Sequence, residues 1–425
     1  MRDSRDRPAP LLKDASTRRY LVGRVVSEVG SRISREGLPV AAVLVLSATP
    51  LQLSWLAAVT MLPGLLLSPI AGNLADRRRR RPIMIFGDLL RALALLAIPV
   101  LWLTHSLDFW QLLLVSLVVS AITVVYAIAD QAYLPSLVGR DRLTEGNALI
   151  NVAAASGEIA GPTLMGALVQ VLGAPLTLLA DAFSYLFSAL TLISIRRSEP
   201  HPQKTAEQAV SQEATAGLRA SLAHPVLRWL LVASGGMSLF WGGAFGTLYE
   251  LYVLRVLSIS PLTMGVLITL GGVGSLVGAS VFDPLAKKLG VGRAMVFGLL
   301  CSALFMLLVP LARGPWLIAV LALAAAQLLG DLTGTVYDIA EVSLRQAITP
   351  DRFLGRINGA TSWVQGTLGV LGALGAGLLA TSIGVRGTFF VAALGGIAVA
   401  IALLASGLAR SPLPDQPDLA HFHRR

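Results

Sequence analysis

The charged residues of segment 20–46 are the first feature of this sequence that could do chemistry. The segment is largely apolar, and its polar residues recur every three or four positions: Arg24, Glu28, Ser31, Arg32, Arg35 and Glu36. Because successive residues of a helix are about 100° apart, this spacing places them on one narrow face. Charges facing lipid are costly, so we expect this face to look into a helix bundle or a watery cavity. It would serve either as a path for a substrate or a proton, or as a closed ladder of salt bridges that locks the helix.

Further ionisable residues lie in or near other apolar segments. Glu158 and Asp331 lie deep within theirs, so we expect them to be candidates for the same path. Asp130, Asp338 and Glu341 lie near the ends of their segments, which suits a gate network better than deep substrate binding. The remaining ones are Asp88, Arg91, Asp181 and Glu250.

Composition indicates a membrane protein. The chain is 55% hydrophobic and 14% charged, whereas soluble domains carry about 25% charged residues. The formal charge of +10 would suggest nucleic-acid binding in a soluble chain, but in a membrane protein it reflects basic cytoplasmic loops, and no nucleic-acid partner is expected. Cys301 is the only cysteine and all five histidines fall in loops or the tail. We therefore expect no disulfide, no metal site and no cofactor.

Twelve segments are long enough to span a bilayer, which takes about 20 apolar residues in a helix. They are longer than barrel strands and lack two-residue alternation, so we expect an all-α polytopic membrane protein. The segments are 20–46, 50–75, 82–104, 108–133, 147–172, 175–195, 228–254, 261–282, 293–312, 315–341, 356–382 and 386–409.

The basic residues predict how these spans are oriented. With the N-terminus in the cytoplasm, 27 of the 34 Lys and Arg residues fall on the cytoplasmic side and three fall in outer loops. This asymmetry predicts that both termini are cytoplasmic. The longest polar stretch between spans divides them six and six. The expected parts are an N-terminal segment 1–19, a six-helix bundle 20–195, a cytoplasmic linker 196–227, a second six-helix bundle 228–409 and a cytoplasmic tail 410–425.

The loop 72–81 carries a resemblance to a known family. It reads Gly-Asn-Leu-Ala-Asp followed by five arginines, and it is similar to the loop G-x-L-A-D-R-x-G-R-K between helices two and three of the major facilitator superfamily (MFS). Arg79 stands where glycine is usual. The resemblance implies a cytoplasmic gate in which Asp130 pairs with Arg80. Its expected residues are Gly72, Asp76, Arg77, Arg80, Arg81, Asp130 and Glu341.

A second run, in the fifth predicted span, is similar to the superfamily's antiporter signature G-x-x-x-G-P-x-x-G-G. The matching residues are Gly157, Gly161, Pro162 and Gly166, and Met165 replaces one glycine. Such a run removes side chains so that helices approach closely, and its proline bends the helix. The resemblance implies an exporter, while ordinary small-residue packing is the alternative.

The two predicted halves repeat each other weakly. The stretch 134–142 aligns with 344–352 at a shift of 210 residues. At a shift of 211, Gly161 and Gly372 align, as do Asp130 and Glu341. Parallel halves of this kind are typical of MFS transporters.

Over its whole length the chain resembles the bacterial exporter group that includes enterobactin and macrolide exporters. The resemblance implies no enzyme activity, but a proton-coupled efflux permease of the bacterial inner or plasma membrane that works by alternating access. The expected partners are a small-molecule substrate, protons and the lipid bilayer, and the expected state is a monomer. An importer or facilitator of the same fold, and a non-transporting receptor or scaffold, are the alternatives. The substrate stays open, because the arginines of segment 20–46 suit an anion such as a siderophore, whereas Glu28 and Glu158 suit a cationic drug.

Overall fold

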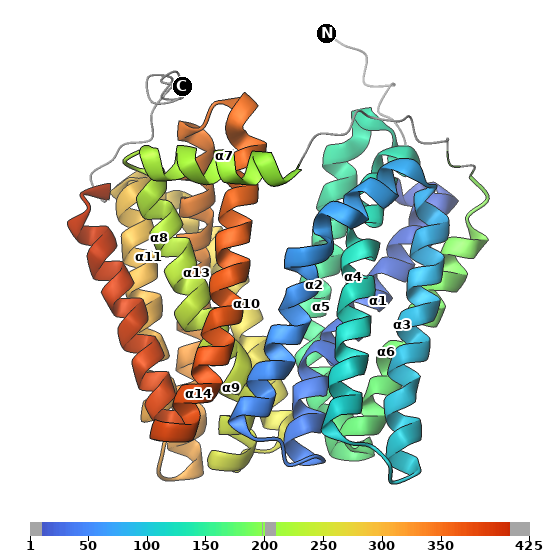
Figure 1. Ribbon diagram of the computed structural model, residues 1–425, viewed down its shortest axis with the longest axis horizontal. Helices are drawn as coiled ribbons and strands as arrows, with labels where there is room; N and C mark the ends of the chain where they lie inside the picture. The colour runs from blue at the N-terminus through green and yellow to red at the C-terminus, as the bar shows by residue number, and fades with distance from the viewer. Residues whose placement is uncertain (1–10, 198, 200–209, 409–425) are drawn as a thin grey trace. The chain divides into compact units, whose positions relative to one another are not determined.

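The computed structural model describes residues 11–197, 199 and 210–408. These residues form helices joined by short turns, and none of them lies in a strand. The predicted all-α fold is therefore confirmed (Figure 1).

The first half of the chain contains six long helices. Each is an apolar run, and glycines with positive φ separate several of them, for example Gly139 (φ 82°) and Gly173 (φ 85°), because L side chains rarely adopt this conformation. Asp108 begins α4 with a capping box. The Asp108 side chain accepts a hydrogen bond from the backbone amide of Gln111, and the Gln111 side chain accepts one from the backbone amide of Asp108. The helices are α1 (Ala15–Leu44), α2 (Pro50–Arg77), α3 (Arg80–Leu103), α4 (Phe109–Val138), α5 (Leu143–Leu172) and α6 (Ala174–Ser194).

The second half begins with α7 (Val210–Ala223), which Figure 1 shows lying across the ends of the neighbouring long helices. The helical run 227–256 that follows alternates between α-helix and π-helix. It consists of α8 (Leu227–Met237), the π-helix η3 (Ser238–Phe245), α9 (Gly246–Leu251) and the π-helix η4 (Tyr252–Val256). The later helices are α10 (Pro261–Leu289), α11 (Val291–Met306), α12 (Leu308–Leu311), α13 (Trp316–Ile348) and α14 (Asp351–Ala405), the last of which bends at Gly384.

Nine helices within the described residues are long and apolar enough to cross a membrane. The expected number of twelve crossings is not established by this count and stays a prediction. The charged helix α1 is not among the nine. The run 227–256 and a second arm of α14 beyond Gly384 are the other places where further crossings would lie.

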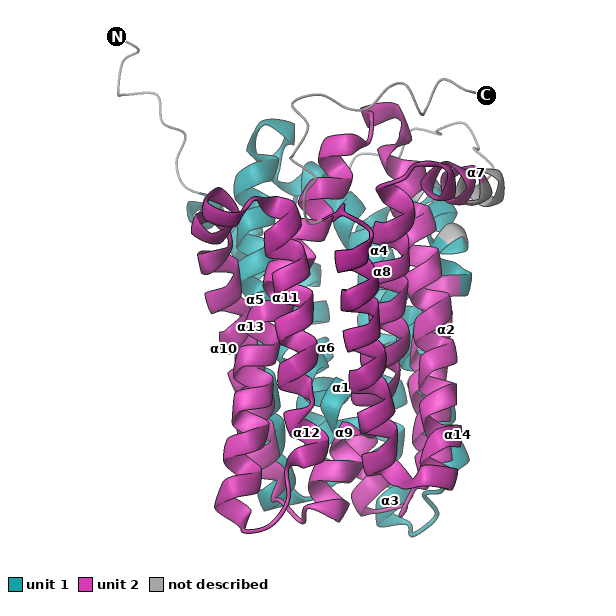
Figure 2. Ribbon diagram, turned by 90° about the vertical axis from the view of Figure 1, so that its left-hand side faces the viewer, with its two compact units in different colours: residues 1–38, 66–206 teal, residues 39–65, 207–425 magenta. Residues whose placement is uncertain are grey.

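The chain forms two compact units (Figure 2). Unit 1 comprises residues 1–38 and 66–206, and unit 2 comprises residues 39–65 and 207–425. In unit 1, α3 lies between α4 and α6. Helix α1 runs close along α6, as two of its glycines show. A Cβ added at Gly23 would lie 2.1 Å from Thr191 Oγ1, and a Cβ added at Gly30 would lie 2.0 Å from Ser184 Oγ, so neither position has room for a side chain. The glycines of α1 thus allow a close approach to α6.

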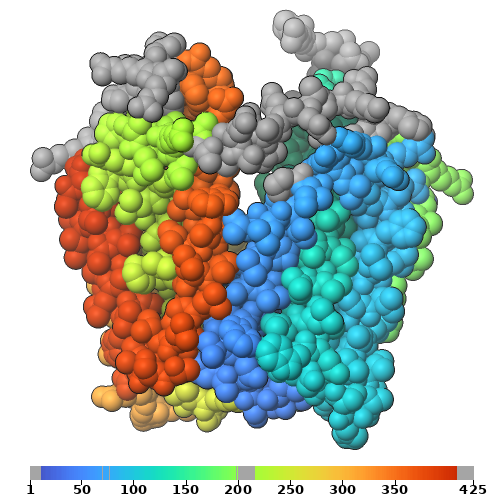
Figure 3. All heavy atoms as spheres, viewed as in Figure 1, coloured from blue at the N-terminus to red at the C-terminus, as the bar shows by residue number. Residues whose placement is uncertain are grey.

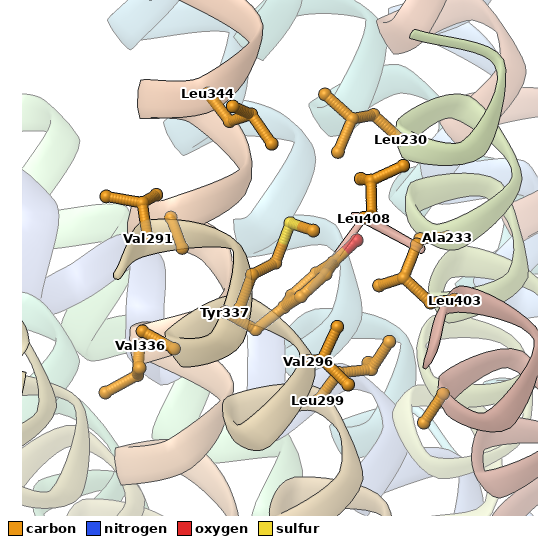
Figure 4. Packing of buried hydrophobic residues seen from close by; sticks show 14 of the residues in the cluster. Leu230, Ala233, Val291, Val296, Leu299, Val336, Tyr337, Leu344, Leu403 and Leu408 are labelled. Atoms are coloured by element: carbon orange, nitrogen blue, oxygen red, sulfur yellow. The ribbon is translucent and has the colours of Figure 1, made fainter. Parts of the chain in front are cut away.

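Unit 2 is built around α13, which packs against both α10 and α11. Figure 4 shows its buried apolar cluster, in which Tyr337 of α13 lies among side chains such as Leu299 and Val296. On the α10 side, a Cβ added at Gly274 would lie 2.2 Å from the carbonyl oxygen of Leu328. Helices α14 and α7 form much of the face of this unit seen in Figure 3.

Candidate functional site

The N-terminal part of the charged α1 face is closed by ion pairs. Arg24 lies 2.7 Å from Glu28 one turn later and 3.1 Å from Asp130 of α4, measured between guanidinium nitrogen and carboxylate oxygen. The other oxygen of Asp130 accepts a hydrogen bond of 2.7 Å from the hydroxyl of Tyr20. The Asp130 side chain is only 4% exposed. This end of the face is therefore an ion-paired network between α1 and α4 that is centred on the buried Asp130.

The C-terminal part of the face is open. Arg32 lies 2.8 Å from Glu158 of α5 and 3.4 Å from Glu36, and Arg35 lies 3.8 Å from Glu158. The side chains of Glu158 and Arg35 are 49% and 67% exposed. Ion pairs therefore run along the whole face, and its C-terminal end carries the more exposed charges. The use of this face as a path for a substrate or a proton stays a prediction.

The glycines of α5 bring these charges together. A Cβ added at Gly157 would lie 2.8 Å from the carbonyl oxygen of Glu28, and one at Gly161 would lie 2.5 Å from Cβ of Arg32. Pro162 and Gly166 of the same run are buried. The antiporter-like run therefore lies directly against the charged turns of α1, so its small residues determine how closely Glu158 approaches Arg32.

Two predicted site residues lie elsewhere. Asp331 of α13 belongs to unit 2 and lies against α10, where a Cβ added at Gly271 would be 2.0 Å from its Oδ2. Glu341, also on α13, pairs with Arg345 of its own helix at 3.5 Å. Its repeat counterpart Asp130 instead takes partners from another helix.

The expected pairing of Arg80 with Asp130 is wrong. Asp130 binds Arg24 and Tyr20, whereas Arg80 lies 3.8 Å from Glu199, which follows α6. The Glu199 carboxylate also accepts hydrogen bonds from the backbone amides of Arg80 (2.7 Å) and Arg81 (3.0 Å). It therefore caps the N-terminus of α3, where free amides and the helix dipole favour an anion.

Of the other predicted gate residues, Arg81 belongs to this cap. The Arg81 guanidinium donates to the carbonyl oxygens of Leu192 (2.8 Å) and Ile193 (2.9 Å) at the end of α6. Gly72 and Arg77 lie near the C-terminus of α2. The side chain of Asp76 lies outside the described part of the structure, so its proposed role stays a prediction.

A second charged cluster lies in the core of unit 1. Asp88 and Arg91 of α3 form an ion pair of 2.5 Å, and both are buried, at 0% and 2% exposure. The Arg91 guanidinium lies 4.1 Å from the ring centroids of both Tyr126 and Tyr185. Sequence reasoning did not connect these residues. The i, i+3 spacing of Asp88 and Arg91 is a usable signal, but the two tyrosines come from helices whose contacts only the tertiary structure shows.

The two π-helices of unit 2 are another feature that the sequence did not predict. Such segments are rare and often occur at functional sites. Between them lies Glu250, which is 5% exposed. Phe245 of η3 stacks on Phe389 with ring centroids 4.8 Å apart, and Arg255 of η4 donates a hydrogen bond of 3.2 Å to the carbonyl oxygen of Ala48. The run 227–256 therefore has buried polar and aromatic contacts on several sides.

Known proteins resemble the chain over most of its length. Residues 26–320 and 239–423 match the family model described as Major Facilitator Superfamily. The multidrug efflux pump Tap of Mycolicibacterium fortuitum is 25% identical over 82% of the chain and 85% of Tap. The enterobactin exporter EntS of Citrobacter koseri is 27% identical over 68% of the chain and 67% of EntS. The uncharacterized MFS-type transporter YfiS of Bacillus subtilis is 26% identical over 87% of the chain and 88% of YfiS.

Solved structures share the fold. A bacterial homologue of the iron transporter ferroportin in an inward-facing state has a TM-score of 0.74 at 19% identity, covering 92% of this chain and 98% of its own. The nucleoside transporter NupG has a TM-score of 0.73 at 12% identity, with the same two coverages. At these identities the likeness concerns the fold alone.

Proposed function

Since this chain belongs to the major facilitator superfamily, we propose that it is an exporter that releases an amphipathic small molecule from the cell in exchange for protons. The family and the relatives are multi-pass membrane transporters, not enzymes. One observation carries the proposal: Gly157 and Gly161 hold α5 against the charged face of α1, whose accessible end is formed by Glu158 and Arg35.

The direction of transport rests on the relatives of known activity. Tap is a multidrug efflux pump and EntS an enterobactin exporter, and both align over two thirds or more of this chain. The run of glycines at 157–166 is the part of the sequence that the superfamily associates with antiport. An importer is the second candidate, because this fold is shared with transporters other than efflux pumps, such as the nucleoside transporter NupG.

The architecture that we propose is two pseudo-repeated six-helix halves with twelve crossings and both termini in the cytoplasm. Repeat-related glycines make similar contacts: Gly161 lies against α1, and a Cβ added at Gly372 would lie 2.1 Å from the carbonyl oxygen of Leu239 in η3. In each case a helix late in its half packs tightly against the helix that begins it. Alternating access would then be a shift between two arrangements, biased by protonation and by substrate.

The charges at the accessible end fit an amphipathic substrate with either sign of charge. An anion would displace Glu158 from Arg32 and Arg35, and a cation would displace the arginines from Glu158. The displaced group is still compensated: Glu158 and Arg35 are 49% and 67% exposed and can be solvated, and Arg32 also lies 3.4 Å from Glu36. Binding therefore does not leave a bare charge in a poorly solvated site, and transport by alternating access requires no covalent step.

Inside-out membrane vesicles from a host without its own efflux pumps test the proposal. Ethidium serves as a cationic probe and a fluorescent catecholate as an anionic one. We expect vesicles that contain the chain to accumulate one of the two probes, and to do so only while a pH gradient is present. Glu158→Gln is expected to lose this accumulation at equal protein amount. Asp141→Asn, at an exposed position outside the network, is the matched control and retains it.

The other outcomes identify the alternatives. Equilibration that a protonophore does not affect would indicate a facilitator. Gradient-driven movement in the opposite direction would indicate an importer. If susceptibility to a broad compound panel is the same with and without the chain, and neither probe moves, a receptor or scaffold is supported.

A further inference from the structure

We propose that Asp181 of α6 is the proton-binding site of this transporter, with Ser184 as its hydrogen-bond partner. The inference deepens the proposed function, since it assigns the exchanged proton to a residue outside the charged face of α1. Asp181 is fully buried, at 0% exposure, in unit 1.

The first argument is the balance of charge in this core. Asp88, Arg91 and Asp181 supply two carboxylates and one guanidinium, all buried. Arg91 is already in contact with Asp88 at 2.5 Å. Among the described residues, no basic group lies within 4.0 Å of the Asp181 carboxylate, and Arg91 attracts it only from a longer distance. An ionised carboxylate without a contacting counter-ion is expensive to bury, and a bound proton removes that cost.

The second argument is the geometry of Ser184, which suits either protonation state. Its hydroxyl oxygen lies 2.8 Å from Asp181 Oδ1 and 2.9 Å from the backbone carbonyl oxygen of the same residue. When Asp181 is ionised, the serine hydroxyl donates to Oδ1. When Asp181 is protonated, the acid donates to the serine oxygen, and the serine hydroxyl rotates to donate to the carbonyl. A hydroxyl can do both because it is a donor and an acceptor.

The third argument is the second oxygen of the acid. Within the described residues, Oδ2 of Asp181 accepts no hydrogen bond, although it is buried. The hydroxyls of Ser34 and Tyr185 are close enough to interact with the Asp181 carboxyl, but neither makes a hydrogen bond of normal geometry with Oδ2. Poorly satisfied buried acceptors are destabilising, and more so when they carry charge, so this oxygen favours the neutral acid while the site is closed to water.

The groups that interact with Asp181 come from three helices. Ser34 of α1 and Ser184 and Tyr185 of α6 supply hydroxyls, and Arg91 of α3 supplies positive charge. Around them, Ser31 donates to Tyr185, while Ser188 and Tyr126 act on the Asp88–Arg91 pair. Among these described groups Arg91 is the only cation, and Asp88 competes for it.

Helix α1 links this site to the substrate path. A Cβ added at Gly30 would lie 2.0 Å from Ser184 Oγ and 2.7 Å from Asp181 Oδ1, so the α1 backbone covers the acid directly. Gly30 lies between Glu28 and Arg32 in the sequence. A displacement of α1 that breaks the Arg32–Glu158 pair would therefore also uncover Asp181, and the proton would leave or bind in that state.

Infrared difference spectroscopy of the purified full-length protein tests the site without any substrate. We expect a pH titration of the wild type to show the carbonyl band of a buried carboxylic acid, and Asp181→Asn to lose this band. Glu28→Gln retains it, as does the matched surface control Asp141→Asn. If the band persists in Asp181→Asn, or disappears in Glu28→Gln instead, the proposal is overturned.

Two further measurements keep the result decisive. Ser184→Ala leaves the acid in place and removes its hydrogen-bond partner, so the carbonyl band must shift in frequency. An unchanged band would contradict the proposal, even if Asp181→Asn fails to fold. In proteoliposomes with a transported probe, Asp181→Asn is expected to lose gradient-driven accumulation and to retain probe exchange. Should the wild type show the band but no proton-driven transport, the proposed function fails while the proton site stands.

Discussion

Replacing Gly157 by alanine is the most direct test of how α1 and α5 fit together. The new Cβ would lie 2.8 Å from the carbonyl oxygen and 3.0 Å from the carbonyl carbon of Glu28, both backbone atoms. Non-bonded carbon contacts are favourable at about 3.5–4.0 Å, so the helices would have to separate by roughly 0.5–1 Å. Overpacking of this size costs about 1–3 kcal/mol. At roughly 2–4 °C per kcal/mol for a unit of this size, the unfolding midpoint would fall by about 2–12 °C.

Gly161→Ala provides an informative comparison. There the new Cβ would meet Cβ and Cγ of Arg32, at 2.5 and 2.6 Å, which belong to a side chain and not to the backbone. Because Cβ of Arg32 is fixed to the α1 backbone, α1 must move here as well, and we expect a loss of stability at least as large as in Gly157→Ala. Arg32 is displaced in addition and its pair with Glu158 is weakened, so transport should fall further than in Gly157→Ala.

The assay is thermal unfolding of the purified variants in detergent, followed by tryptophan fluorescence, alongside probe transport. Gly375→Ala is the matched control, because no described heavy atom lies within 4 Å of the added Cβ at this position. Wild-type stability and transport in Gly157→Ala would refute the close α1–α5 contact on which the site is built.

Three further predictions concern the ends of helices. Glu199→Ala removes the acceptor for two α3 amides, so we expect unit 1 to lose about 0.5–2 kcal/mol, measured as a lower unfolding midpoint; an unchanged midpoint would contradict the capping role. A backbone hydrogen bond from Thr17 lowers the pKa of Asp14 below its ordinary 3.8. The ionised Asp14 carboxylate therefore stabilises the fold fully above pH 3.8, and this stabilisation is lost as the pH falls through the lowered pKa. The midpoint difference between wild type and Asp14→Asn should therefore shrink in acid, and a difference that grows would refute the assignment. In a Cys301→Ser background, an impermeant thiol reagent added outside cells should label Ser106→Cys and not Arg78→Cys, and the opposite pattern would reverse the topology.

The sequence predicted the class of fold because its signals are local. Apolar run length and helical periodicity depend only on neighbouring residues, so the helices and the single charged face of α1 followed directly from them. Helix partners depend on which turns meet after folding. The ion pairs of Arg24 with Asp130 and of Arg32 with Glu158 join residues more than a hundred positions apart, and no local pattern specifies them.

The same limit explains the wrong gate pairing. The pairing of Arg80 with Asp130 was predicted from family resemblance. In the structure, Asp130 pairs with Arg24 of α1, and Arg80 lies beside Glu199. A single carboxylate after α6 gave no sequence signal, because its partners are backbone amides, which every residue has. Asp181 gave only the weak signal of an acid in an apolar run.

On the proposed architecture with twelve crossings, the ion pairs of α1 would also affect how the protein is made. A charged residue near the centre of a spanning helix raises its insertion free energy by about 2.5–3.5 kcal/mol. Glu28 and Glu36 pair with Arg24 and Arg32 within α1, whereas the partners from other helices, Asp130 and Glu158, lie on α4 and α5 and are translated later than α1. We therefore expect α1 to be poorly suited to lipid until α4 and α5 have been synthesised. Chains interrupted before α5 would leave α1 exposed to membrane quality control.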